Sequence, residues 1–157
     1  MLGRALAFNI VQSQGRDSVS VIDANKAACD SLRDWLGIDV QCLDAKNSSI
    51  AGMIKESDAV IVALPYGFNL GFMKRSIAGG AHFCDLGGND DVVSAQLALD
   101  ADAKKAGVLC VPDCGLAPGM AGILGAHLAR QFDSVDELTM RVGGLPQHPV
   151  PPLNYQL

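Results

Sequence analysis

The sequence predicts an α/β protein with a doubly wound parallel sheet, and two observations lead to that fold class. Short runs rich in β-branched and small apolar residues alternate along the chain with longer stretches of helical composition. Strands that are covered by helices on both faces have this near-continuous apolar character. Strand–helix alternation at this spacing is typical of right-handed crossovers, which produce parallel sheets. With 157 residues, 49% of them hydrophobic, the chain is long enough to bury a normal core.

The predicted elements follow this alternation from the first residues onward. A helix is predicted at residues 1–12, with no strand in front of it. Strands are predicted at residues 19–22, 39–43, 59–64, 82–86 and 108–111. Helices are predicted between and after them, at residues 24–36, 48–56, 70–78, 92–106 and 121–131.

Cap residues support several of these boundaries. Gly37 and Gly107 directly follow predicted helices, where glycine commonly forms the C-terminal cap because it tolerates a left-handed backbone. Asn69 is predicted to be an N-cap, as is either Asp90 or Asp91, because short polar side chains accept hydrogen bonds from the first free amides of a helix.

The character of the chain changes near residue 133. Residues 135–142 are predicted to form a further strand, which ends at the pair Gly143-Gly144, and four prolines follow. We therefore expect residues 1–133 to form one domain and residues 134–157 to be the beginning of a second α/β domain.

The first third of the chain resembles the later part of a dinucleotide-binding strand–helix–strand unit. In such a unit a G-x-G-x-x-G turn leads into a helix, and an acidic residue about 20 positions later binds the ribose. Gly3 at the start of the first helix and Asp23 at the end of the first predicted strand match those two positions. We therefore expect a Rossmann-type sheet that lacks its first strand and first two glycines, with Gly3 and Asp23 as cofactor-binding residues. A carboxylate at position 23 favours NAD over NADP, because it repels a 2′-phosphate; the alternative is that Asp23 is an N-cap.

Ligands on open parallel sheets bind beyond the carboxyl ends of the strands, so the residues there are candidates for a site. Leu64 and Pro65 follow one strand, and the adjacent pair Gly87-Gly88, which would allow close approach of a ligand, follows the next. All four are predicted to contact the cofactor. The alternative is that both segments are plain turns. His82 begins its strand, at the opposite end, and is interpreted as structural.

Charge and cysteine content exclude several other classes of protein. The net charge of -5, from 12 basic and 17 acidic residues without a basic run, argues against nucleic acid or an anionic membrane as a partner. No apolar run approaches the roughly 20 residues that span a bilayer, and no signal peptide is visible, so a cytoplasmic protein is expected. The five cysteines form no C-x-x-C pair, and we expect reduced thiols and no metal site.

Five motifs resemble those of the saccharopine dehydrogenase-like family, in the family's order and spacing across essentially the whole chain. They are LPY at 64–66, FNL at 68–70, DLGGN at 85–89, PDCGLAPG at 112–119 and RVGGLP at 141–146. Within the family they most resemble the L-lysine 6-dehydrogenase branch. The resemblance implies a Rossmann domain followed by a substrate and dimerisation domain, and a homo-oligomer when the protein is full length.

The resemblance also implies a reaction. It implies oxidative deamination of an amino acid at a CH–NH group with NAD, most closely of L-lysine at the 6-amino group to the semialdehyde. Tyr66, Asp85, Asp113 and Cys114 are the candidate catalytic residues that line the site. Two alternatives stay open: a saccharopine reductase-like enzyme that uses NADPH, and a dinucleotide-binding module without catalytic activity.

The expected absence of the first strand has a consequence for stability. That strand would lie between the strands at residues 19–22 and 59–64, and without it both have an unpaired edge. Unpaired buried amides cost about 1 kcal/mol or more each. We therefore expect these 157 residues alone to be marginally stable and to bind NAD weakly.

Overall fold

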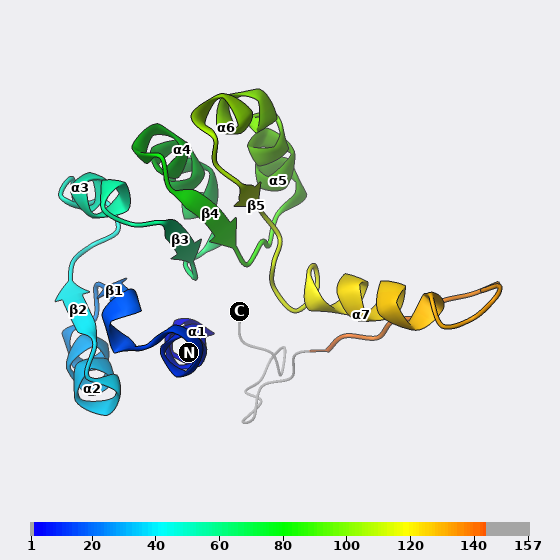
Figure 1. Cartoon of the computed structure of the whole chain (residues 1–157), viewed down its shortest axis with the longest axis horizontal. Helices are drawn as coiled ribbons and strands as arrows, with labels where there is room; N and C mark the ends of the chain where they lie inside the picture. Colours follow the sequence, from blue (N-terminus) through cyan, green and yellow to red (C-terminus); the bar gives the residue numbers. More distant parts are fainter. Residues whose placement is uncertain (1, 144–157) are drawn as a thin grey trace, which may run out of the picture.

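The computed structural model describes residues 2–143 and consists of short parallel strands with helices packed around them (Figure 1). The strands are β1 (Ser20–Asp23), β2 (Asp39–Cys42), β3 (Ala59–Val62), β4 (His82–Asp85) and β5 (Cys110–Val111). The helices are α1 (Leu2–Gln14), α2 (Lys26–Leu36), α3 (Ile50–Lys55), α4 (Asn69–Gly79), α5 (Asp90–Leu97), α6 (Asp100–Ala106) and α7 (Met120–Ala129). Two 3-10 turns, η1 (Arg16–Ser18) and η2 (Tyr66–Phe68), complete the described elements. All five predicted strands are confirmed, each with slightly different ends.

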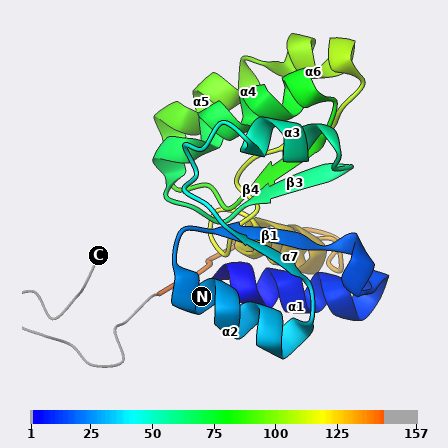
Figure 2. The same cartoon turned by 90° about the vertical axis from the view of Figure 1, so that its left-hand side faces the viewer.

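The strands form two parallel sheets. β1 pairs with β2, while β3, β4 and β5 form a second sheet in that order. Helices α3 to α6 cover one side of the strands, and α1, α2 and α7 lie on the other (Figure 2). The predicted α/β class with parallel pairing is therefore confirmed. β1 and β3 are not hydrogen-bonded to each other, which agrees with the expectation that these two strands are not direct neighbours.

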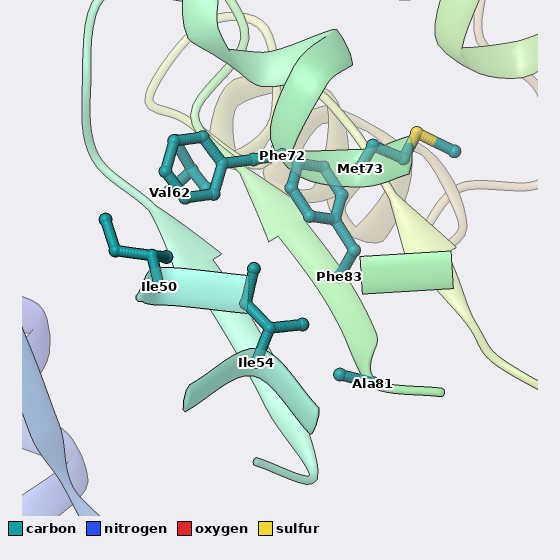
Figure 3. Packing of buried hydrophobic residues seen from close by; sticks show 7 residues of the cluster. All are labelled: Ile50, Ile54, Val62, Phe72, Met73, Ala81 and Phe83. Atoms are coloured by element: carbon teal, nitrogen blue, oxygen red, sulfur yellow. The ribbon is translucent and has the colours of Figure 1, made fainter. Parts of the chain in front are cut away.

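Each sheet has its own hydrophobic core. The core of the three-stranded sheet contains side chains from α3, α4, β3, β4 and the residue before β4 (Figure 3): Ile50, Ile54, Val62, Phe72, Met73, Ala81 and Phe83. The core of the two-stranded sheet contains Ala7, Cys29, Leu32, Leu36, Ile38 and Val40. Ile22 of β1 is a partly buried residue that packs against the first of these cores, so the two parts of the domain are in contact.

The C-terminal caps are as predicted, but the N-terminal ones are not. Gly37 and Gly107 have left-handed backbones, with φ of 63° and 71°, and close α2 and α6. The N-cap of α5 is Asn89, whose side chain accepts from the amide of Val92 at 3.0 Å, so the prediction of Asp90 or Asp91 was wrong. Asn69 is also no N-cap, because it is the first residue of α4 itself and is buried.

Two predicted elements differ from the structure. The helix predicted at residues 92–106 is two helices, because the chain leaves helical geometry at Leu99, whose side chain packs against the core of the three-stranded sheet. Residues 135–142 form no strand. Leu138 and Met140 instead lie next to Gly125 of α7, where no strand edge is available to pair with them. Gly144 and the rest of the predicted second domain lie outside the described residues.

None of the helices within residues 2–143 combines the length and the apolar character needed to cross a membrane.

Candidate functional site

The carboxyl ends of β3, β4 and β5 are neighbours, because the three strands are parallel and adjacent. The loops that follow them contain most of the predicted site residues. Asp85 is the last residue of β4 and is completely buried. Asp113 and Cys114 follow β5, and Tyr66 lies on the turn η2 that follows β3.

Asp85 joins the loops after β4 and β5. Its Oδ1 accepts hydrogen bonds from the amides of Gly87 at 2.7 Å and Asp113 at 3.2 Å. Its Oδ2 accepts from Nε2 of Gln96 at 2.6 Å, and its backbone carbonyl accepts from the amide of Cys114 at 2.8 Å. Because both carboxylate oxygens accept hydrogen bonds from the protein, the Asp85 side chain holds the two loops in place and has little remaining capacity to bind a substrate.

Asp113 has an unusual conformation beside that network. Its φ is 61°, a left-handed backbone that aspartate tolerates better than most residues. Its Oδ1 packs against Gly87, where a Cβ atom would overlap it, and this oxygen is buried without a hydrogen-bond partner among the described residues. Burial first, and then the neighbouring carboxylate of Asp85, raise the pKa of Asp113, while a hydrogen bond from the backbone of Gly88 opposes them. A half-buried carboxyl with a raised pKa beside glycine turns is a candidate for proton transfer.

The other strand-end residues are accessible. Leu64, Pro65, Tyr66 and Cys114 are exposed. Tyr66 lies next to Gly88, where an added Cβ would be 3.5 Å from the Tyr66 Cβ. The structure therefore brings Tyr66, the glycine pair and Asp113 together at one edge of the sheet.

The loop from Pro112 to Gly119 is tightly packed against itself. Gly119 has a φ of 121° and lies so close to the Gly115 carbonyl that a Cβ atom would overlap it. The amide of Met120, the first residue of α7, donates to the carbonyl of Gly115 at 2.9 Å. Glycine is thus required at position 119 for the loop to turn into the helix.

Asp23 and Gly3 belong to the other sheet and its covering helix. Asp23 ends β1 and is exposed, and its Oδ1 accepts from the amide of Asn25 at 2.8 Å. The N-cap of α2 is Asn25, so the alternative that Asp23 is the cap is wrong. Gly3 lies at the start of α1, where its ideal Cβ would be 3.7 Å from the Cβ of Ala63, just past the end of β3. That is an ordinary contact distance, so α1 begins beside β3 but the packing does not itself require glycine.

The sequence did not point to Gln96 as a residue of this region. Gln96 of α5 is completely buried and supplies the third donor to Asp85. Nothing in the sequence distinguishes it from a surface glutamine.

Two residues named from the sequence have structural surroundings here. Asn69, predicted as an N-cap, is instead a buried residue of α4 that is 1% exposed, and its Oδ1 has no partner among the described residues. His82 accepts from the amide of Leu109 at 2.9 Å, in agreement with its structural interpretation.

Comparison with known proteins identifies the family of this chain. Residues 1–111 match the family described as the saccharopine dehydrogenase NADP binding domain. The chain belongs to this family. It is therefore an NAD(P)-binding domain with a Rossmann-like fold, as the sequence motifs implied.

Solved structures of low sequence identity share the fold. Saccharopine dehydrogenase (L-Glu forming) from Saccharomyces cerevisiae is 19% identical with a TM-score of 0.69, over 82% of this chain and 28% of that one. Biliverdin reductase from Synechocystis sp. PCC 6803, solved with biliverdin and NADP+, is 19% identical with a TM-score of 0.53, over 82% of this chain and 37% of that one. GenD2 of gentamicin A biosynthesis, solved with NAD, is 17% identical with a TM-score of 0.58, over 82% and 36% of the two chains. The chain thus spans 28% to 37% of the lengths of these three proteins.

The residues present fit a dinucleotide. Asp23 presents an exposed carboxylate at the carboxyl end of β1, and only one of its oxygens accepts a hydrogen bond from the described residues. Vicinal ribose hydroxyls are the donors that such a carboxylate accepts in this fold. The N-terminus of the 13-residue helix α1 lies beside the end of β3, and helix N-termini stabilise phosphates.

Proposed function

We propose that this domain binds NAD in preference to NADP. The observation that carries the preference is the exposed carboxylate of Asp23 at the end of β1. An acidic residue at that position accepts from the ribose hydroxyls, and it repels the 2′-phosphate of NADP. The first turn of α1 would hold the pyrophosphate, and Leu64, Pro65, Gly87 and Gly88 would lie along the nicotinamide half.

We further propose that the whole protein is a dehydrogenase that acts on the CH–NH group of an amino acid, with the 6-amino group of L-lysine as the first candidate. When bound, NAD would supply the acceptor for the hydride that leaves the carbon carrying the amine. The amine loses a proton to the protein, and water hydrolyses the resulting imine to an aldehyde and ammonia. The support for this proposal is the family membership together with the cluster of Tyr66, Asp113 and the glycine pair at the strand ends.

Each residue of that cluster has a proposed role. Asp113 accepts the proton that the substrate amine releases, because its carboxyl is half-buried at the strand ends and burial raises its pKa. Asp85 accepts three side-chain hydrogen bonds and so fixes the positions of Asp113 and Gly87 relative to each other. Tyr66 and Cys114 are exposed beside them and line the space that the substrate enters. The proposed second domain would recognise the rest of the substrate and would mediate assembly into a homo-oligomer.

Activity of the full-length protein tests this reaction. Reduction of NAD is followed in the presence of L-lysine and other amino acids, and oxidation of NADPH is followed with an aldehyde and glutamate. NAD reduction that depends on lysine supports the first candidate, whereas NADPH oxidation that depends on glutamate supports the saccharopine reductase-like alternative. Asp113→Ala should lower turnover about tenfold or more, as expected for loss of a general base. If neither reaction occurs while dinucleotide still binds, the domain is a binding module.

A further inference from the structure

Two of the five cysteines meet where β4 ends and the loop after β5 begins. Cys84 is paired across the sheet with Val111, and Cys114 follows Val111 by three residues. The left-handed backbone of Asp113 turns the chain back toward β4. The amide of Cys114 donates to the carbonyl of Asp85 at 2.8 Å, and its Sγ donates to the carbonyl of Val111 at 3.5 Å. The Sγ of Cys84 also approaches the Asp85 carbonyl, at 3.9 Å, so the Cys84 thiol and the Cys114 backbone meet at one oxygen atom.

The two thiols differ in accessibility. Cys114 is exposed, whereas Cys84 is partly buried. Burial first, and then the neighbouring Cys114 side chain, raise the pKa of Cys84 to about 12. Because the thiolate is the nucleophile in cysteine oxidation, Cys84 does not react first at neutral pH. Cys114 is therefore the thiol that meets an oxidant from solvent, and Cys84 lies near it on β4.

We propose that Cys84 and Cys114 form a peroxide-reactive dithiol that closes to an intrachain disulfide. The Cys114 thiolate attacks one oxygen of hydrogen peroxide, the O–O bond breaks, and hydroxide leaves to give a sulfenic acid. The Cys84 sulfur then attacks the Cys114 sulfur, loses its proton and displaces the hydroxyl, which leaves as water. In sum, two thiols and one hydrogen peroxide give one disulfide and two waters; both sulfurs are oxidised and the peroxide is reduced.

The disulfide lies within the candidate site, and its formation does not depend on the proposed dehydrogenase function. It links β4 directly to the residue that follows Asp113, and so ties together the two loops that Asp85 already joins. Oxidation would therefore restrict the movement of these two loops, beside which the dinucleotide is proposed to bind.

The other thiols provide internal comparisons. Cys42 is the other exposed thiol, so the Cys42→Ser variant removes a competing reactive group and leaves Cys114 as the exposed thiol. Cys110 is partly buried on the strand β5 next to β4, and it serves as the matched control for Cys84.

The test is peptide mapping by mass spectrometry, without reduction, of the full chain carrying Cys42→Ser after treatment with hydrogen peroxide. The expected result is a Cys84–Cys114 linked peptide that disappears after dithiothreitol. Adding Cys114→Ser or Cys84→Ala should abolish it, whereas adding Cys110→Ser should leave its yield unchanged within about twofold. Circular dichroism of each reduced variant confirms that it is folded before oxidation.

A chain oxidised in denaturing guanidinium separates the effect of the fold from the reactivity of the thiols. There the four remaining thiols should form a mixture of pairs set by loop length and not by the fold. The proposal is overturned if the native chain gives the same mixture of pairs as the denatured one. It is equally overturned if Cys114 of the native chain ends as a sulfinic acid or an intermolecular disulfide while Cys84 stays reduced.

Discussion

A single buried carboxylate organises the residues of the candidate site. Asp85 accepts three hydrogen bonds through its side chain, and its backbone carbonyl accepts from the amide of Cys114; these partners lie on two loops and on α5. A buried charge without such donors would cost several kcal/mol, so every donor contributes to holding the loops in place. Ligands on parallel sheets bind beyond the carboxyl ends of the strands, and this rule led from the sequence to Asp85, Asp113 and Asp23. It requires only the strand positions and the residue types. It could not find Gln96, because the burial of one side of a short helix follows from tertiary packing.

Replacing Gln96 should destabilise the domain although it touches no proposed ligand. Gln96→Leu removes the donor at 2.6 Å from the buried Asp85 carboxylate, and the expected loss is about 1 to 3 kcal/mol of unfolding free energy. Urea denaturation measures it, with the exposed Gln14→Leu on α1 as the control, expected to change the free energy by less than about 0.5 kcal/mol. An equally small effect at both positions would show that the hydrogen bond to Asp85 contributes nothing measurable.

Asp113 should make the domain less stable as the pH rises. Burial and the Asp85 charge raise its pKa in the folded state, so between about pH 4 and the folded pKa the folded chain binds more protons than the unfolded chain. Stability attributable to this carboxyl is therefore greatest at low pH and is lost as the pH rises through the folded pKa. Asparagine also tolerates a left-handed backbone, so Asp113→Asn should be more stable than the wild type at neutral pH. The difference should vanish below about pH 4, the ordinary pKa of an aspartate in an unfolded chain.

Asp30 provides a control of opposite sign for that pH series. Its pKa is lowered, chiefly by the hydrogen bond from Lys26, so Asp30→Asn should be less stable than the wild type at neutral pH. That difference should also disappear as the pH falls through the lowered pKa. Urea denaturation across the pH range measures both variants. A constant difference for Asp113→Asn at every pH would contradict the raised pKa.

At the scale of helices and strands, the helix ends that are closed by glycine were easier to predict than the helix starts that are capped by a polar side chain. Gly37 and Gly107 close their helices because a left-handed residue is needed there. The N-cap of α5 was misplaced by one residue, because Asn89, Asp90 and Asp91 are all suitable acceptors and only the backbone decides among them. Residues 135–142 were predicted to form a strand but do not. An apolar run forms a strand only when it can pair with the edge of another strand, and this depends on tertiary structure.

Two alanine substitutions of glycine should have opposite effects. Gly107 has a φ of 71° and open space around it, so Gly107→Ala adds backbone strain without a clash and should cost about 1 kcal/mol. Gly52 lies within α3 with no atom within 4 Å of its ideal Cβ, so Gly52→Ala should stabilise by up to about 1 kcal/mol. Urea denaturation of the two variants checks the pair. A gain of stability in Gly107→Ala would contradict its assignment as a left-handed cap.

At the scale of the whole molecule, the domain has two sheets with two separate cores. Ile22 of β1 packs against the core of the three-stranded sheet, but no core residue is shared. The parallel class and the family were predictable from strand spacing and from motifs such as DLGGN at 85–89. The detailed geometry of the site was not predictable, because the left-handed turn at Asp113 and the bond from the Cys114 amide to Asp85 depend on how two loops distant in sequence meet.

The two parts of the domain should unfold at different denaturant concentrations. Trp35, the single tryptophan, stacks on Phe8 at 5.3 Å between ring centroids and reports on α1 and α2. A second probe, Tyr66→Trp in a Trp35→Phe background, reports on the three-stranded part, where residue 66 is exposed and tolerates a larger ring. We expect the two fluorescence midpoints to differ, because few contacts couple the cores. Coincident transitions that also match circular dichroism would show one cooperative unit instead.

The proposed preference for NAD depends on Asp23, and competitive binding of the two dinucleotides to the full-length protein tests it most directly. NAD and NADP are titrated by calorimetry against the wild type, Asp23→Asn, and the control Asp17→Asn, whose exposed carboxylate precedes β1 at the opposite end of the strand. We predict that the wild type and Asp17→Asn bind NAD at least about tenfold more tightly than NADP, and that Asp23→Asn loses most of that preference. Tighter binding of NADP by the wild type, or a preference for NAD that survives Asp23→Asn unchanged, would contradict the account.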